Sequence, residues 1–422
     1  MKSAVTIIEY YIYRIPTHIL SFTDPMRSLL TLLPYFKRYR VKFIAGILLT
    51  AFSCLTAAVM PRFVGSAINS LQAKTATTES LLWDAAGIIG MSLLTSYSFY
   101  WVRQTIIVAS REIEFDLRND FLKHLLTLPM SYFQNTPQGE VMAYATNDIN
   151  AVRNAVGPAI MYAGDAFLTF VFSFIYMLII SPKLTLISLA PLPMMSVAVY
   201  IIGKRVQPLF DGVQSHYSDL TARATESISG MKVVKAYVRE LYERDTFDVL
   251  SDGYYKKNMR LIKIQGLMMP AIFGFVGLSV VLLLLFAAPS IISGEFKLGD
   301  LTQFLIYLGM LTWPFMGIGI ISNMVQRSAS SMARLNKVFD TKSDITDTPA
   351  TDTSITEIEG NVEFRNVSFK YRDELPEVLH HIDLEIPKGH TLAIIGKTGS
   401  GKSSFVQLIP RLYDTTGGNI FI

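Results

Sequence analysis

Residues 396–403 read Gly396-Lys397-Thr398-Gly399-Ser400-Gly401-Lys402-Ser403, which fits the phosphate-loop pattern G-x-x-x-x-G-K-[ST]. Just before it, Thr391–Ile395 is a short apolar run of the kind found in a strand buried on both faces. Just after it, Ser403–Ile409 has the residue pattern of a helix. Strand, glycine loop and helix thus follow in the order in which this pattern binds nucleotide phosphates. The structural alternative is a glycine turn before a surface helix, which would not require all three elements together.

The residue types of this loop suit a triphosphate. Gly396, Gly399 and Gly401 free the backbone to meet an anion with its N–H groups. Lys402 can reach the β and γ phosphates, and the Ser403 hydroxyl can ligate Mg²⁺. We therefore expect ATP and Mg²⁺ as cofactors, with Ser403 as the metal ligand. The expected ATP-binding residues of the loop and its helix are Gly396, Lys397, Thr398, Gly399, Ser400, Gly401, Lys402, Ser403 and Ser404.

The composition indicates a membrane protein. Half of the 422 residues are hydrophobic and 17% are charged, which is too apolar for an ordinary soluble protein of this size. The net charge of +4 is mild, and no basic cluster with interleaved aromatic residues is present, so no nucleic-acid partner is expected. Cys54 is the one cysteine, which excludes disulfides within the chain, and the six histidines have no metal-ligand spacing.

Six stretches are long enough to cross a hydrocarbon layer, which takes roughly 20 residues of helix. They are Phe43–Ile68, Leu82–Ile107, Val156–Ile180, Leu184–Gly203, Leu267–Ile292 and Leu301–Met324. Lys and Arg are concentrated before the first span and in the second–third and fourth–fifth connections, whereas the other three connections hold only three lysines. Because positive charge stays on the cytoplasmic side, we expect both termini, both long connections and the phosphate loop in the cytoplasm of a multi-pass membrane protein.

Arg62, Arg103 and Asp165 are three ionisable residues within the predicted spans. Charged groups at membrane depth are functional candidates, here for contact with a transported solute. Each of the three lies toward an end of its span, so a purely structural role is the alternative.

The two long connections are expected to be helical. Arg111–Leu128 and Ser215–Lys263 have apolar residues at helical spacing with mixed charge between them, so the membrane helices should continue into the cytosol as hairpins. Each hairpin is broken once, at Pro129–Gly139 and near Ser229–Lys232. A short crosswise segment at each tip would suit the transmission of force to a cytoplasmic domain.

The last part of the chain predicts a small sheet around the phosphate loop. Residues 341–360 are rich in Thr, Asp and Ser, which predicts an exposed linker. Apolar residues then alternate around Phe364 and around Leu384, as in half-buried strands, and Pro387-Lys388-Gly389 forms the turn after the second strand. A further strand is expected at Asn419–Ile422.

The expected fold is an α-helical six-span transmembrane domain followed by the N-terminal part of an α/β P-loop nucleotide-binding domain. The expected ranges are a dispensable N-terminal extension at 1–26, the transmembrane domain at 27–330, the linker at 331–360 and the partial nucleotide-binding domain at 361–422.

This order of elements resembles the ATP-binding cassette exporters of the half-transporter type, particularly their bacterial multidrug-type and lipid-type members. The stretches that carry the resemblance are Gln138-Gly139-Glu140-Val141, Thr146-Asn147-Asp148, Glu226-Ser227-Ile228-Ser229-Gly230, Val234-Lys235-Ala236-Tyr237 and Phe364-Arg365-Asn366-Val367-Ser368-Phe369-Lys370-Tyr371.

The resemblance implies roles that spacing alone does not show. Tyr371 matches the aromatic position that stacks on adenine. The two hairpin breaks match the coupling segments that press on nucleotide-binding domains, and the matching residues are Phe133, Gly139, Ser229, Gly230 and Met231. Family members work as dimers in a lipid bilayer, so the implied partner is a second subunit, identical or different. The implied location is the bacterial inner membrane, and the implied activity is ATP-driven alternating access that exports a small apolar or amphipathic drug or lipid.

Several family motifs are not found up to Ile422, namely the glutamine loop, the LSGGQ-type signature, the Walker B acidic residues and the switch histidine. The expectation for the chain as written is therefore a truncated nucleotide-binding domain that binds ATP without hydrolysing it and has no catalytic residue. Two other classes stay open. A membrane nucleotide-binding sensor or nonproductive partner subunit would bind without turnover, and a membrane-anchored P-loop kinase or GTPase would have no need of two long basic hairpins.

Overall fold

The structure is a computed structural model that describes residues 24–343, 345–347, 351–352, 354–355, 357–372 and 374–422. Most of the expected N-terminal extension, 1–26, lies outside these residues. The chain divides into two compact units, each described by itself below. The first contains residues 1–35, 111–154 and 326–422, and the second contains residues 36–110 and 155–325.

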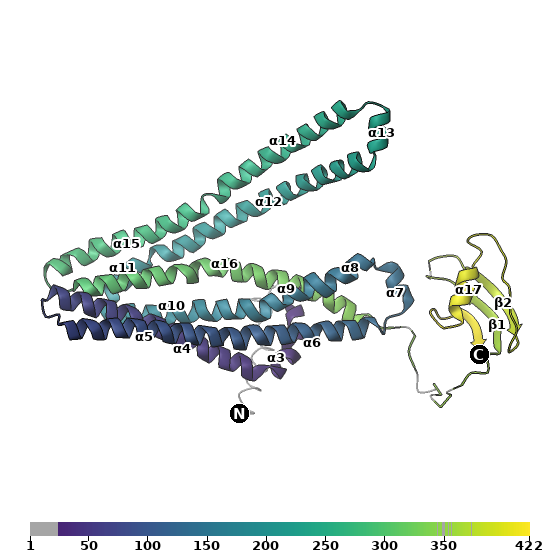
Figure 1. Cartoon of the computed structure of the whole chain (residues 1–422), viewed down its shortest axis with the longest axis horizontal. Coiled ribbons are helices and arrows are strands. Elements are labelled where there is room, and N and C mark those ends of the chain that lie inside the picture. Colours follow the sequence, from purple (N-terminus) through teal and green to yellow (C-terminus); the bar gives the residue numbers. More distant parts are fainter. Residues whose placement is uncertain (1–23, 344, 348–350, 353, 356, 373) are drawn as a thin grey trace. The chain divides into compact units, whose positions relative to one another are not determined.

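Among the residues that the structure describes, six helical segments are long and apolar enough to cross a membrane, so the six predicted spans and the fold class are confirmed. Each segment extends beyond its predicted span. The segments are Arg40–Gln72, Thr78–Leu125, Gln138–Ile180, Pro182–Ser229, Glu240–Ile292 and Leu298–Asp340. In Figure 1 they contain α4 (Arg40–Gln72), α5 (Thr78–Val102), α10 (Ile160–Ile180), α11 (Pro182–Leu189) with α12 (Pro191–Ser229), α15 (Met268–Ile292) and α16 (Leu298–Asp340).

Local sequence marks where these helices begin. The Thr77 side chain accepts a hydrogen bond from the backbone N–H of Ser80, and the Ser80 hydroxyl accepts one from the backbone N–H of Thr77, which forms a capping box before α5. Before α11, Ser181 accepts from the backbone N–H of Leu184 and Pro182 occupies the first helical turn.

The two predicted hairpins are present. The first consists of α6 (Val108–Leu125), α7 (Met130–Asn135), α8 (Gln138–Ala143) and α9 (Ile149–Asn154), and the second of α12, α13 (Met231–Ala236) and α14 (Glu240–Gln265). In Figure 1 the short helices α7 and α13 lie across the tips of their hairpins. Both predicted breaks are therefore confirmed as helix interruptions. Three wider, π-helical turns also occur along the second and third spanning segments, η2 (Arg103–Ile107), η3 (Tyr144–Asp148) and η4 (Ala155–Ala159).

The core of the second unit lies between α10, α11, α12, α15 and α16. Its centre is Tyr307, whose ring is fully buried and stacks on Tyr176 at a centroid distance of 6.0 Å. The Tyr307 hydroxyl donates to the backbone carbonyl of Ala58 at 2.7 Å, which joins α16 to α4. The buried apolar side chains around it are Met177, Leu184, Leu192, Leu283, Ala287, Phe296, Leu301, Phe304, Leu308 and Leu311.

The backbones of α4 and α16 come into close contact at two glycines. A Cβ atom on Gly299 would lie 2.1 Å from the carbonyl oxygen of Gly65, and the Gly299 backbone N–H donates to the Asn69 side chain at 2.8 Å. Small residues at such a contact let two backbones pack without side chains between them.

In the first unit, the end of α16 packs on the first hairpin. Arg334 donates through Nε to the nearly buried carboxylate of Asp148 at 2.9 Å, and the Ser331 hydroxyl donates to the same carboxylate at 2.8 Å. Because Met332 and Leu335 are buried on this helix, assigning residues 331–340 to the linker was wrong. The linker composition begins only at Thr341, and residues 331–340 form the last turns of α16.

The lead-in before the first span belongs to this unit as far as Tyr35. It consists of α2 (Asp24–Arg27), η1 (Ser28–Leu32) and α3 (Leu33–Arg38). Ser28 donates to the carbonyl of Ala329 at 2.8 Å, and the Tyr35 hydroxyl donates to Asp120 at 2.7 Å. Burial, and then the hydrogen bond to Asp120, raise the pKa of Tyr35, so the phenol stays a donor at neutral pH.

The C-terminal part forms a small antiparallel sheet with the strand order β2-β1-β3. The strands are β1 (Val362–Phe369), β2 (Leu379–Ile386) and β3 (Gly417–Phe421). They confirm the two strands predicted from alternating apolar residues and the strand predicted near the end of the sequence. One helix, α17 (Lys402–Leu408), packs on the sheet, where Phe405 stacks on Phe364 with ring centroids 4.2 Å apart.

The prediction that Thr391–Ile395 is a buried strand was wrong. These residues have no strand assignment and are exposed, with 94% of Ile395 accessible. A strand of a parallel sheet gains its hydrogen bonds and its burial from neighbouring strands on both sides. None of the strands in the described residues pairs with this segment, so the apolar sequence alone does not produce the strand.

The contact between Gly65 and Gly299 is testable by adding one methyl group. Gly299→Ala places its Cβ against the Gly65 carbonyl, so we expect a loss of stability of roughly 1–3 kcal/mol from overpacking. The matched control is Gly309→Ala on the same helix, where nothing lies within 4 Å of the added atom. The control should match the wild type or gain about 0.5–1 kcal/mol, because alanine favours helix. Thermal unfolding in detergent measures both, and equal midpoints for the two variants would contradict the close contact.

Candidate nucleotide-binding site

The phosphate loop has its backbone geometry set by glycine. Gly399 and Gly401 both have φ of +86°, in the left-handed region that other residues rarely adopt. Gly401 is also the residue before α17, and a Cβ atom there would lie 3.0 Å from the carbonyl oxygen of Val378. The loop thus needs glycine at position 401 for two independent reasons, its dihedral angle and its contact with the segment leading into β2.

Lys402 closes over the loop that precedes it. Its ammonium donates to the carbonyl oxygens of Gly396 and Lys397, both at 2.8 Å, and reaches the Ser400 hydroxyl at 3.3 Å. The charge is therefore held within the curve of the loop by backbone oxygens, where it can meet a phosphate without moving far.

The two serines at the start of α17 have different surroundings. Ser403 is exposed, whereas Ser404 is 5% exposed and its hydroxyl lies 2.7 Å from the Tyr371 hydroxyl. A free hydroxyl beside phosphates is a suitable oxygen ligand for Mg²⁺, which favours Ser403 over Ser404 for that role. The side chain of Ser404 instead contacts Tyr371, two residues after the end of β1. Among the residues that the structure describes, no group of three His, Cys, Asp or Glu side chains could hold a metal ion.

Tyr371 belongs to an aromatic group beside the helix. Its ring lies edge-on to Phe369 at 4.8 Å and to Tyr413 at 5.3 Å, while the residue itself stays half-buried. Burial, and then the neighbouring Tyr371, raise the pKa of Tyr413. The hydroxyl contact with Ser404 places Tyr371 next to the first turn of α17, within the same small domain as the loop.

The expected coupling residues lie at the two breaks. Phe133 is in α7 and 37% exposed, and Gly139 is the second residue of α8. Ser229 ends α12, Gly230 lies between the helices, and Met231 begins α13 with 44% of its surface exposed. Both tips therefore present apolar side chains to their surroundings.

An ion pair closes the second hairpin just behind its tip. Glu243 on α14 accepts from Arg223 at 2.7 Å and from the Ser227 hydroxyl at 2.6 Å, both on α12. The side chains of Glu243 and Arg223 are about one fifth exposed, at 21% and 22%, so the contact is partly shielded from water. Sequence reasoning missed this contact because it joins residues twenty positions apart on two helices.

Arg62, Arg103 and Asp165 each contact a side chain within the second unit. Arg62 lies over the ring of Tyr176 at 5.7 Å and Arg103 over the ring of Phe99 at 5.1 Å. The thiol of Cys54 lies 3.5 Å from the carboxylate of Asp165. These contacts suit structural roles and leave the expectation of solute contact untested.

Comparison with known proteins identifies the class. Residues 43–315 match the family model for the ABC transporter transmembrane region, and residues 379–422 match the model named ABC transporter. The chain belongs to the ABC transporter family and is a multi-pass membrane protein with an ATP-binding domain of that family.

Individual relatives are bacterial transport proteins. The chain is 32% identical to a probable multidrug resistance ABC transporter ATP-binding/permease protein, YheI, of Bacillus subtilis, over 92% of this chain and 66% of that protein. It is 27% identical to the multidrug resistance-like ATP-binding protein MdlA of Escherichia coli, over 94% of this chain and 67% of that protein. It is 31% identical to an ATP-dependent lipid A-core flippase of Pseudomonas syringae pv. tomato, over 73% and 50%. The chain thus spans about two thirds of the length of the curated relatives it matches over most of its residues.

The Glu243 contact predicts how firmly α13 is held. Glu243→Gln removes the charge that Arg223 meets, so the tip should open more often and trypsin should cleave it about twofold to fivefold faster, as for loss of a pair worth up to about 1 kcal/mol. Glu226→Gln is the matched control, because Glu226 pairs with the same arginine at 3.0 Å but is 72% exposed. Limited proteolysis of both variants measures the difference, and equal rates would show that the Glu243 pair does not hold the tip.

Proposed function

We propose that the chain is the ATP-binding and membrane-spanning part of an exporter that moves apolar or amphipathic solutes, such as drugs or lipids, out of the cytoplasm. The observation that carries this proposal is one chain holding six spanning helices, two helical hairpins and a phosphate loop of the ABC transporter family. The printed names of relatives, multidrug resistance transporters and a lipid A-core flippase, support this range of solutes.

The proposed ATP site consists of residues 396–404 with Tyr371. The loop backbone and Lys402 would bind the phosphates, Ser403 would hold Mg²⁺, and the exposed part of the Tyr371 ring would pack against adenine. The bound Mg²⁺ would neutralise phosphate charge. The Ser404 hydroxyl contacts the Tyr371 hydroxyl and so holds the Tyr371 side chain. Ser404 would therefore contribute to nucleotide binding through its backbone N–H and by positioning Tyr371.

The proposed mechanism joins nucleotide binding to the membrane helices through the hairpin tips. Phe133 and Gly139 at the first tip, and Ser229, Gly230 and Met231 at the second, would meet nucleotide-binding domains in the assembled transporter. The exposed apolar surface of Met231 and Phe133 supports such a contact, since apolar groups at a hairpin tip gain by burial. A second half-transporter subunit, identical or different, completes the assembly in a bacterial inner membrane with both termini in the cytoplasm.

Nucleotide binding by the 422-residue chain tests the site. Lys402→Ala removes a charged donor to phosphate, so the affinity for a fluorescent ATP analogue should fall about tenfold to a hundredfold, as for loss of charge-assisted hydrogen bonds. Lys388→Ala is the control, because Lys388 is exposed in the turn after β2 and carries the same charge. Fluorescence titration in the presence of Mg²⁺ gives both affinities.

Three outcomes distinguish the exporter from the other functions considered. Equal affinities for the two variants would contradict the phosphate-loop assignment. A preference for GTP over ATP would favour a kinase or GTPase. The chain as written is expected to bind ATP without hydrolysing it, so uptake is measured in inverted membrane vesicles that also contain a hydrolysis-competent half-transporter of the family. Wild-type ATP binding without ATP-dependent uptake of an amphipathic dye into these vesicles would favour the nucleotide-binding sensor or nonproductive partner over the exporter.

A further inference from the structure

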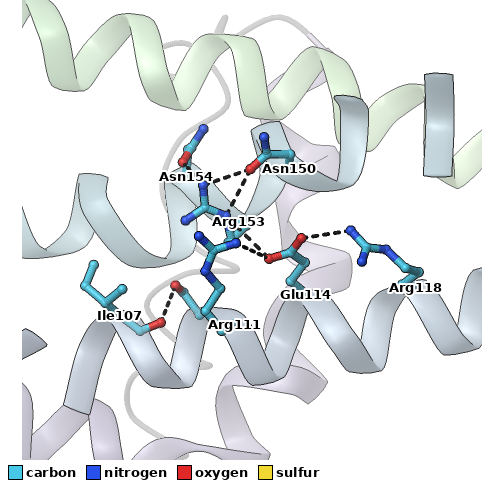
Figure 2. A network of polar contacts seen from close by, with 8 residues as sticks. Ile107, Arg111, Glu114, Arg118, Asn150, Arg153 and Asn154 are labelled. Atoms are coloured by element: carbon cyan, nitrogen blue, oxygen red, sulfur yellow. Dashed lines mark hydrogen bonds and ion pairs between the residues drawn. The ribbon is translucent and has the colours of Figure 1, made fainter. Parts of the chain in front are cut away.

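A group of charged side chains lies at the base of the first hairpin, and we refer to it as the arginine cluster. It consists of Arg111, Glu114 and Arg118 on α6 with Arg153 on α9 (Figure 2). The carboxylate of Glu114 accepts from Arg111 at 2.9 Å and from Arg118 at 2.8 Å, and lies 3.5 Å from Arg153.

Positive charge exceeds negative charge in the arginine cluster. Three guanidinium groups meet one carboxylate, which leaves a net charge of +2. Glu114 is 9% exposed, whereas the side chains of Arg111 and Arg118 are 60% and 52% exposed, so the excess charge faces outward. In the contacts that the structure describes, Arg111 and Arg118 each donate to Glu114 through one nitrogen, whereas a guanidinium group carries five N–H donors.

Two asparagine side chains of the same helical turn hold Arg153 in place. Its guanidinium donates to the amide oxygen of Asn150 at 2.8 Å and to that of Asn154 at 2.7 Å, both from the same turn of helix. Figure 2 shows these two amides on the α9 side of the cluster. These hydrogen bonds hold the guanidinium of Arg153 beside Glu114, so its positive charge has a fixed place in the arginine cluster.

The acidic residues of α6 do not neutralise the cluster. Successive residues of an α-helix are about 100° apart, which places Asp116 and Asp120 on the side of α6 opposite Arg111 and Arg118, and Glu112 roughly 100–120° away from both arginines. Asp120 accepts a hydrogen bond from Tyr35 there, on the side that meets the lead-in. The helix thus separates its charges, with the excess positive charge on one face.

The depth of the cluster matches lipid headgroups. Arg111 lies four residues beyond the second predicted span, and Arg153 three residues before the third, which correspond to about 6 Å and about 4.5 Å along a helix. The headgroup layer begins at the hydrocarbon edge and is roughly 5–8 Å thick on each side. Arg118 lies eleven residues beyond the span, about 16 Å along the helix and past that layer.

Two π-helical turns flank the cluster. The turn η2 ends at Ile107, before Arg111, and η4 begins at Ala155, after Arg153. A π turn changes the direction in which the following side chains point and is common at functional sites. Here the turns lie where each helix passes from the predicted span to the cluster.

We propose that the arginine cluster binds the phosphate of an anionic phospholipid in the cytoplasmic leaflet, with Arg111 as the main contact and Glu114 holding Arg111 in place. The charge of the site matches a phosphodiester, and its depth matches a lipid rather than a soluble anion. The proposal uses the proposed orientation of the chain but does not depend on its transport activity.

Two variants with the same chemistry test the site. Arg111→Gln and Arg118→Gln each remove one positive charge and one contact to Glu114, but only Arg111 lies in the headgroup layer. Native mass spectrometry of the full chain in neutral detergent, titrated with dioctanoyl phosphatidylglycerol, gives the affinity for bound lipid. Arg111→Gln should weaken binding about fivefold, the effect of one arginine near an anionic surface, and Arg118→Gln less than twofold. The two unfolding midpoints should agree, because each variant loses one comparable ion pair.

Two further ligands, a zwitterionic lipid and a soluble phosphate ester, show whether the cluster recognises an anionic lipid or any phosphate. Dioctanoyl phosphatidylcholine should bind wild type and both variants alike, and glycerol 1-phosphate should bind at least tenfold more weakly than phosphatidylglycerol. Equal weakening by the two substitutions, or no preference for phosphatidylglycerol over phosphatidylcholine, would overturn the proposal. So would glycerol 1-phosphate binding as tightly as the lipid. If Arg111→Gln instead separated dimers with lipid affinity unchanged, the cluster would be a subunit contact.

Discussion

Backbone hydrogen bonding in the membrane is the constraint on which this structure depends. In hydrocarbon no water can meet an exposed N–H or C=O, so the spanning segments are helical, with one turn residue, Ala190, between α11 and α12 in the fourth predicted span. The interruptions at α7 and α13 therefore lie outside the predicted spans, at the hairpin tips. The helix α12 runs from the fourth predicted span to its tip without a break, whereas a turn at Gly266-Leu267 separates α14 from α15. An unbroken helix can carry a displacement at one end to the other, which is what the proposed coupling of nucleotide binding to transport requires.

The phosphate loop obeys a different and more local constraint. The positive φ angles of Gly399 and Gly401, the fold of Lys402 onto the loop carbonyls and the seating of Phe405 on Phe364 need only a short stretch of chain and a three-stranded sheet. The segment Thr391–Ile395 shows the limit of such local order, because its apolar side chains are exposed without neighbouring strands.

The sequence predicted well those parts of the fold that depend on patterns among neighbouring residues in the chain. Hydropathy located the six spans, Pro129–Gly139 and Gly230 marked the two breaks, and alternation of apolar residues located β1 and β2. Contacts between distant residues gave no such signal: Arg111, Arg118 and Arg153 served only to orient the chain, and their meeting at Glu114 could not be read from spacing. Residues 331–340 were misassigned for a related reason, since their burial depends on Asp148 and other residues of the first hairpin. The roles of Tyr371 and of the tip residues rest on family resemblance and stay predictions.

The central claim is that filling the phosphate loop changes the helices at the hairpin tips. Hydrogen–deuterium exchange of residues 230–238 in the full chain, with and without ATP and Mg²⁺, measures this most directly. The account predicts that ATP alters exchange at α13 in the wild type and leaves it unchanged in Lys402→Ala. Unaltered exchange at α13 in wild-type protein saturated with ATP would contradict it.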